Sequence, residues 1–163
     1  MVLPVDFINE TKRLMGEELF NIFEKAIKEE APSSIRVNPL KCSTSGINIP
    51  LEDGNIPWCD HITHGIYLKR RPNFTFDPMF HAGLYYVQEA SSMFITHALS
   101  QWVDAPVTML DLCAAPGGKS TAAKSVLPAG SLLFSNEPMR NRANILADNI
   151  AKFGDKDIIV TNN

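Results

Sequence analysis

Residues 113–120 are the part of the chain whose types and spacing best suit ligand binding. The run Cys-Ala-Ala-Pro-Gly-Gly-Lys-Ser has almost no side-chain bulk before Lys119. Such a loop lets a ligand approach main-chain N–H groups closely. An apolar run at 107–112, interrupted by Asp111, precedes the loop, and helix-forming residues follow at 120–127. A strand, a glycine loop and a helix in this order indicate the nucleotide-binding end of a doubly wound α/β domain.

Three ligand chemistries compete for this loop. A phosphate-binding loop has the pattern G-x-x-x-x-G-K-[ST]; Gly118, Lys119 and Ser120 match its end, but Cys113 stands where the first glycine is required. The dinucleotide pattern G-x-G-x-x-G is absent. Binding of S-adenosylmethionine needs a close approach of the ligand to the backbone but no pyrophosphate-binding loop. The sequence is therefore compatible with this third ligand. The alternative without a ligand is a glycine loop that only turns the chain.

An acidic residue downstream supports a nucleoside ligand. Residues 131–135 form a second predicted strand, and Glu137 follows it, nineteen residues after Gly118. An acid at the tip of the second strand is where a ribose diol is held by hydroxyl-to-carboxylate hydrogen bonds. The alternative is a charged residue at a helix start, because Pro138 fits the first helical position.

Four segments resemble the Nop/Sun family of RNA cytosine-C5 methyltransferases. They are SIRVNPLK at 34–41, GLYYVQEASSM at 83–93, LDLCAAPGGKS at 110–120 and SNEPMRNR at 135–142. The resemblance implies a transferase that uses S-adenosylmethionine to methylate carbon 5 of cytosine in ribosomal or transfer RNA. We therefore predict a cofactor-binding set of eight residues: Cys113, Ala114, Ala115, Pro116, Gly117, Gly118, Lys119 and Glu137.

The same resemblance implies that the residues of the methyl-transfer step lie outside this chain. The family uses a cysteine thiolate that adds to carbon 6 of cytosine and a second cysteine that assists release, both after the third strand. Cys113 is the only cysteine near the loop, and the resemblance makes it a cofactor-loop residue. An acid that holds the adenine edge would follow Asn163. We therefore predict no catalytic residue here and expect an N-terminal fragment that is inactive alone.

The elements around the loop predict an α/β protein. Before a hinge at 104–106, we expect helices at 4–14, 17–30 and 90–102, the first two separated by a break at Gly16. In the same part we expect strands at 34–37, 66–68 and 84–87 and loops at 44–58 and 74–80. After it, we expect strands at 107–112, 131–135 and 157–160 and helices at 120–127 and 139–153. The predicted organisation is an N-terminal α+β module (1–103), followed by the first half, strands one to three, of a Rossmann-like S-adenosylmethionine-dependent methyltransferase sheet (104–163).

Five basic residues of the N-terminal module are the candidate RNA contacts. They are Arg36, Lys41, Lys69, Arg70 and Arg71. The net charge of −3 means that an RNA surface must be a local patch of the protein. These residues suit phosphate contacts, and the alternative is ordinary surface charge on solvated loops.

Composition excludes several other classes of protein. A content of 45% hydrophobic and 20% charged residues is ordinary for a globular protein. Cys42, Cys59 and Cys113 fit no zinc pattern, and the spacing of the four histidines (His61, His64, His81 and His97) argues against a metal site. No stretch resembles a signal peptide or a transmembrane helix, so we expect a cytoplasmic protein.

The predicted sheet also suggests self-association. In the family, strand one is central and strand four pairs with its far side, but the sequence supplies no strand four. The run 107–112 would then be an exposed apolar edge that pairs with other chains. Two other classes of function stay open: a non-catalytic RNA- or cofactor-binding module, and a nucleotide hydrolase, which Cys113 at the glycine position disfavours.

Overall fold

The computed structural model describes residues 2–52, 56–59 and 65–163. The chain divides into two units, Met1–Pro32 and Ser33–Asn163, and each is described by itself. The first contains α1 (Val5–Ala26), which is interrupted at Gly16, where φ is 81° and ψ is 165°. The predicted helix break at Gly16 is therefore confirmed. The predicted helix end at residue 30 is wrong by one turn. After Ala26 the backbone N–H groups of Lys28 and Glu29 bond to the carbonyl oxygens three residues earlier, in turns that precede Pro32.

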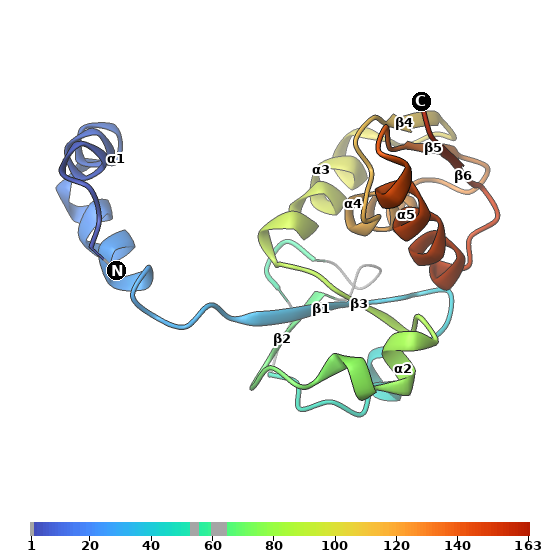
Figure 1. The fold of residues 1–163 in the computed structure, drawn as a ribbon, viewed down its shortest axis with the longest axis horizontal. Coiled ribbons are helices and arrows are strands. Elements are labelled where there is room, and N and C mark those ends of the chain that lie inside the picture. The colour runs from blue at the N-terminus through green and yellow to red at the C-terminus, as the bar shows by residue number, and fades with distance from the viewer. Residues whose placement is uncertain (1, 53–55, 60–64) are drawn as a thin grey trace. The chain divides into compact units, whose positions relative to one another are not determined.

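The second unit begins with a small antiparallel sheet. Its strands are β1 (Ser33–Val37), β2 (Gly65–Leu68) and β3 (Tyr85–Val87), in the order β2-β1-β3. Figure 1 shows β1 in the middle of this sheet. Ile35 is paired with Ile66 on one side and with Val87 on the other, and it lies in an apolar core with Val37, Leu68 and Tyr85.

Two predicted loops contain short helical turns. The segment predicted as a loop at 74–80 contains η2 (Phe74–Phe76) and α2 (Pro78–His81), and the loop at 44–58 contains η1 (Thr44–Gly46). The reason for α2 is local, because the Asp77 side chain accepts a hydrogen bond from the Met79 N–H at 2.8 Å and Pro78 occupies the first turn. The helix predicted at 90–102 is a 3₁₀ turn, η3 (Ser91–Met93), followed by α3 (Phe94–Trp102).

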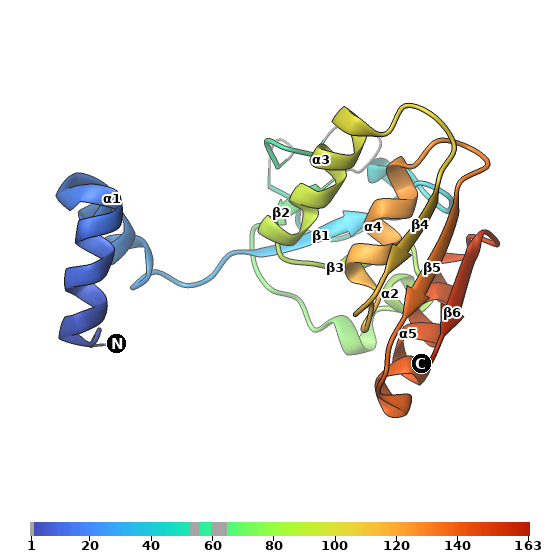
Figure 2. The ribbon, with the colours of Figure 1, turned by 90° about the horizontal axis from the view of Figure 1, so that it is seen from above.

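The loop of interest lies in a parallel sheet of three strands. They are β4 (Thr108–Asp111), β5 (Leu132–Asn136) and β6 (Ile158–Thr161), in the order β4-β5-β6. The strands are connected by α4 (Gly118–Val126) and α5 (Arg140–Phe153). Because the strand order progresses in one direction, right-handed crossovers place both helices on one face of the sheet, as Figure 2 shows. The predicted α/β class and the three strands of a Rossmann-like sheet are confirmed.

The two sides of the parallel sheet differ in burial. Leu133 and Ile158 pack with Leu146, Ile150 and Phe153 of α5 in an apolar core. Among the described residues β4 pairs only with β5, so its other edge is unpaired. Leu110 and Leu112 at this edge are 56% and 64% exposed.

In the described part of the chain, no helix combines the length and the apolar character that crossing a membrane requires.

Candidate cofactor-binding site

The loop between β4 and α4 is tightly packed on both sides. Gly117 has φ 106°, which is the left-handed region, and a Cβ there would lie 3.2 Å from Cδ1 of Leu146. A Cβ on Gly118 would lie 3.1 Å from Cε1 of Tyr86. Either added methyl would push on a neighbour, and at Gly117 it would also strain the backbone. The two glycines therefore let the loop pass between β3 and α5.

Asp111, the last residue of β4, organises the loop from inside. Its Oδ1 accepts a hydrogen bond from the Cys113 N–H at 3.3 Å, and its Oδ2 accepts one from Ser120 Oγ at 2.7 Å. One carboxylate thus connects the start of the loop to the first turn of α4. Sequence reasoning treated Asp111 only as an interruption of an apolar strand. An acid at the carboxyl end of a core strand, just before a glycine loop, was the signal that could have found it.

The N-terminus of α4 presents main-chain donors. Gly117 is the N-cap residue, and no side chain among the described residues caps the helix. The first N–H groups of a helix have no partner inside the helix, and they favour a negative or electron-rich ligand. Next to them is a pocket of about 240 Å³. Its lining includes six of the predicted cofactor-binding residues (Cys113, Ala114, Ala115, Pro116, Gly118 and Lys119) and, from the other side, Tyr86, Gln88, Glu89 and Ser92.

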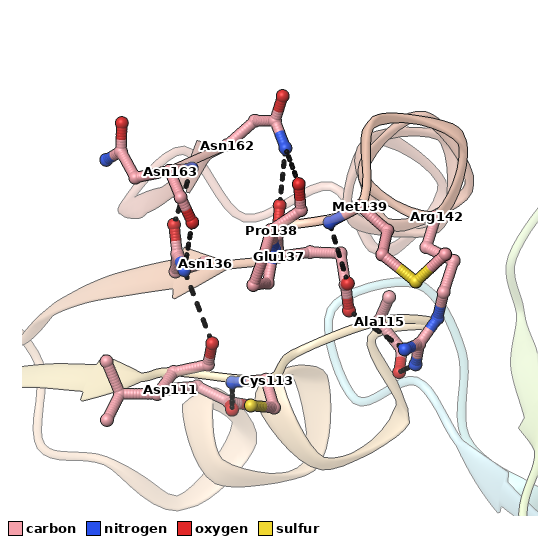
Figure 3. Close-up of polar contacts among 11 residues, drawn as sticks. Asp111, Cys113, Ala115, Asn136, Glu137, Pro138, Met139, Arg142, Asn162 and Asn163 are labelled. Carbon is pink, nitrogen blue, oxygen red and sulfur yellow. Dashed lines mark hydrogen bonds and ion pairs between the residues drawn. The ribbon is translucent and has the colours of Figure 1, made fainter.

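Glu137 lies at the end of β5 and is 1% exposed. Its Oε1 accepts a hydrogen bond from the Met139 N–H at 3.1 Å, at the start of α5. Its Oε2 is buried and has no hydrogen-bond partner among the described residues. Figure 3 shows this carboxylate beside the loop. One oxygen therefore serves the helix start, as one of the two sequence interpretations expects, and the other makes no hydrogen bond within the described residues.

Arg142 of α5 joins Glu137 to the loop. Its Nη1 lies 3.5 Å from Oε2 of Glu137, and its Nη2 donates to the Ala115 carbonyl oxygen at 2.9 Å. Asn149, two turns further along the helix, donates to the Pro116 carbonyl oxygen at 2.7 Å. Neither side chain was singled out from the sequence. Their only signal was position, because side chains of α5 can reach a loop on the same face of the sheet.

Polar residues at the ends of β5 and β6 fix the Glu137 segment. Asn162 donates to the carbonyl oxygens of Glu137 at 2.6 Å and Pro138 at 3.0 Å. Thr161 Oγ1 donates to Asn136 Oδ1 at 2.9 Å. Figure 3 shows the two contacts of Asn162 with Glu137 and Pro138. The structure therefore brings the predicted loop and the predicted acid together at the carboxyl edge of the sheet, where ligands bind in folds of this type.

The five predicted RNA contacts are not brought to one surface. Arg36 is 1% exposed and is held inside the fold. Lys41 follows β1 and donates to the Ala82 carbonyl oxygen at 2.8 Å, whereas 69–71 follow β2. Because β1 and β2 are antiparallel and Ser33 pairs with Leu68, these two exposed groups follow opposite ends of β1, a strand roughly 13 Å long.

The remaining candidate residues show no clustering. Within the described residues, no group of three or more His, Cys, Asp or Glu side chains could hold a metal ion. His61 and His64 lie outside the described residues. Cys113 is exposed at the loop, Cys59 is buried, and burial raises the pKa of the Cys42 thiol.

Comparisons with known proteins agree with this geometry. Residues 3–90 match the family model for the N-terminal domain of 16S rRNA methyltransferase RsmF, and residues 103–163 match that for 16S rRNA methyltransferase RsmB/F. The ribosomal RNA small subunit methyltransferases F of Serratia proteamaculans and Pectobacterium atrosepticum are 31% and 33% identical to the chain over 170 and 171 residues. Both alignments cover 98% of the chain and 34% of the relative, so the chain spans about a third of the length of these relatives.

A solved structure supports the fold. The methyltransferase homolog protein from Pyrococcus horikoshii is 26% identical, with a TM-score of 0.73, over 99% of this chain and 57% of that one. The resemblance to the Nop/Sun methyltransferases is thereby confirmed. Since the model for the N-terminal domain of 16S rRNA methyltransferase RsmF alone covers more than half of the chain, the chain belongs to the family that this model describes.

Proposed function

We propose that this chain forms the cofactor-binding half of an enzyme that transfers a methyl group from S-adenosylmethionine to carbon 5 of a cytosine in ribosomal RNA. The observation that carries the proposal is the buried Oε2 of Glu137, which has no hydrogen-bond partner among the described residues and lies beside the glycine loop. Arg142 Nη1 forms an ion pair with this oxygen at 3.5 Å but no hydrogen bond, so a ligand donor would complete its hydrogen bonding. A ribose hydroxyl is such a donor.

The chemical types of the residues at this site suit S-adenosylmethionine. Glu137 would accept from the ribose, as an acid at the tip of the second strand does in related nucleotide-binding folds. The uncapped N-terminus of α4 and the small residues of the loop would allow a close approach of the ligand to the backbone. Arg142 would hold Glu137 and Ala115 in a fixed relation. When bound, the cofactor supplies an electrophilic methyl group on a sulfonium.

The pocket of about 240 Å³ has a second wall that suits the target nucleotide. Gln88, Glu89 and Ser92 line it opposite the loop, and the exposed Lys119 lies at its edge. Amide, carboxylate and hydroxyl groups can form hydrogen bonds to the edge of a base that has left its stack. In this proposal the cluster at 69–71 contacts phosphates, and Lys41 makes a separate contact.

The methyl-transfer step itself needs a thiolate that adds to carbon 6 of the base. We assign no such role to Cys113, because it begins the cofactor loop and its N–H is held by Asp111. The boundary between residues 103 and 104 is part of the proposal. Residues 1–103 would contact RNA, and residues 104–163 would bind the cofactor.

Titration calorimetry with S-adenosylmethionine, S-adenosylhomocysteine and ATP tests the proposal. We expect weak binding of the two adenosyl compounds and no response to ATP. The same titrations on Glu137→Gln should show a loss of affinity, and Asp148→Asn, an exposed acid on α5, is the matched control. Tight ATP binding without a response to S-adenosylmethionine would instead favour a nucleotide hydrolase. RNA binding without any response to the adenosyl compounds would favour a non-catalytic RNA-binding module.

A further inference from the structure

Three polar side chains lie on one face of β1 and its continuation. Ser34, Arg36 and Asn38 share this face, because successive residues of a strand alternate between its two sides. All three are buried. Asn38 donates to the carbonyl oxygens of Gly83 and Phe153, both at 2.9 Å, so it connects the antiparallel sheet to the end of α5. This polar face is therefore where the antiparallel sheet meets the parallel-sheet part of the same unit.

Arg36 reaches the glycine loop from this face. Its Nε donates to Gln88 Oε1 at 2.9 Å, and its Nη2 donates to Thr121 Oγ1 at 2.6 Å, with the Gly118 carbonyl oxygen at 3.5 Å. The Thr121 hydroxyl in turn donates to the Gly117 carbonyl oxygen at 2.8 Å. A chain of hydrogen bonds thus runs from β1 to the left-handed glycine of the loop.

The charge of Arg36 has no carboxylate partner among the described residues. Its guanidinium carbon lies 5.9 Å from the ring centroids of both Tyr86 and Phe153. Burial lowers its pKa to about 10, so the group stays protonated at neutral pH. A buried cation of this kind is costly, and an apolar side chain would avoid the cost. The planar guanidinium of Arg36 can, however, donate hydrogen bonds to Gln88 and to Thr121 of α4 at the same time.

The loop rests directly on residues that Arg36 holds. A Cβ on Gly118 would lie 3.1 Å from Cε1 of Tyr86 and 3.5 Å from Nε2 of Gln88. Gln88 is fixed by its hydrogen bond to Arg36, and Tyr86 lies against the guanidinium. The antiparallel sheet therefore supports the loop from the side opposite α5.

We propose that Arg36 is a positioning residue that fixes the segment 117–121 in the conformation that binds the cofactor. The antiparallel sheet is then a structural part of the cofactor site and does more than present RNA-binding groups. This inference rests on the proposed cofactor function. It also gives Arg36 a role that replaces the predicted contact with RNA phosphate.

The first test compares cofactor affinity in three variants of the whole chain, each checked for folding by circular dichroism and thermal unfolding. Arg36→Lys keeps the charge but cannot contact Gln88 and Thr121 together, and Thr121→Val removes only the hydroxyl that receives the bond. Both should weaken binding of S-adenosylhomocysteine by about tenfold or more. Asn38→Ala is the control, because it removes buried hydrogen bonds of the same face that do not reach the loop. It should lower the melting temperature and leave the affinity within about twofold of the unaltered chain.

The second test needs no ligand. Amide hydrogen exchange should become faster at Gly117 and Thr121 in Arg36→Lys and Thr121→Val, while the Leu133 amide of the core keeps its protection. Unchanged exchange at Gly117 and Thr121, or an equal loss of affinity in Asn38→Ala, would overturn the inference. If Arg36→Lys does not fold, Arg36→Met takes its place, because it has no donor for Gln88 or Thr121 and leaves the Thr121 hydrogen bond to Gly117 intact. Failure of the unaltered chain to bind any adenosyl compound would overturn the proposed function, whereas the exchange rates would still decide whether Arg36 fixes the loop.

Discussion

The guanidinium of Arg142 lies 3.5 Å from the buried carboxylate of Glu137. The same guanidinium donates to the Ala115 carbonyl oxygen, so one side chain of α5 joins the acid after β5 to the loop after β4 (Figure 3). Neither group alone defines a binding site. In the proposed site, this contact would hold the carboxylate and the small-residue loop at a fixed separation, as recognition of a ribose requires.

Glu137→Gln should weaken cofactor binding strongly and destabilise the chain only slightly. The amide loses the charge that strengthens hydrogen bonds from the ribose, at a cost of about 1.5–3 kcal/mol, or roughly 10- to 150-fold in affinity. The substitution also replaces the charged partner of Arg142 by a neutral amide, and because the Arg142 side chain is half exposed, the melting temperature should fall only slightly. Calorimetry and thermal unfolding check the two effects. A large fall in melting temperature with unchanged affinity would make Glu137 a helix-start residue only.

Arg142→Met should also lower cofactor affinity, because Glu137 and Ala115 lose the group that connects them. The expected cost is about 1–3 kcal/mol of binding free energy. Arg142→Lys should recover little of it, since an ammonium cannot contact both partners in the same geometry. Full recovery of affinity in Arg142→Lys would show that only the positive charge matters.

Asp111→Asn should destabilise the loop, because a neutral amide forms weaker hydrogen bonds to the Cys113 N–H and to Ser120 than the carboxylate does. We expect a loss of about 1–3 kcal/mol in the free energy of unfolding, measured with urea. Ser120→Ala removes the same bond from the other side. The double variant should therefore cost less than the sum of the two single variants, and strict additivity would contradict a direct interaction.

The unpaired edge of β4 should drive self-association. Leu110 and Leu112 are exposed there, and a bare apolar edge strand pairs readily with other chains. Light scattering after gel filtration should show species larger than a monomer at tens of micromolar, and Leu110→Lys should reduce them. Ile145→Lys, an equally exposed apolar site on α5, is the control. A stable monomer with protected Thr108 and Leu110 amides would mean that the edge is covered from within.

The chain alone should transfer no methyl group. Its three cysteines are Cys42, Cys59 and Cys113, and none has been assigned the role of nucleophile. Incubation with tritiated S-adenosylmethionine and bulk ribosomal RNA should give no incorporation. Incorporation that disappears in Cys113→Ser would show that the loop cysteine is the nucleophile.

Local patterns predicted the parts of the site that depend on neighbouring residues. The strand, the loop at 113–119 and the following helix were evident from composition and glycine positions, and the position of Glu137 came from its distance to Gly118. The break of α1 at Gly16 was predicted for the same reason, because glycine determines conformation locally.

Contacts between distant residues could not be predicted. Arg36 is a basic residue and was therefore predicted to contact phosphate. Its hydrogen-bond acceptors, Gly118 and Thr121, lie 82 and 85 positions further along the chain. Arg142 similarly meets Ala115 across 27 positions. The separation of Lys41 from 69–71 follows from an antiparallel register that charge spacing does not reveal. The sequence identified Arg36, Lys41 and 69–71 as candidate contacts and did not single out Arg142. Only the fold showed which residues they contact.

The most direct test of the central claim is a titration of the ¹⁵N-labelled chain with S-adenosylhomocysteine, followed by amide chemical shifts. The account predicts a set of changes confined to the loop at 113–119 and to Glu137 and its neighbours, with saturation at a ligand concentration that rises in Glu137→Gln. No shift in the loop, or shifts only at residues far from the carboxyl edge of the parallel sheet, would contradict it.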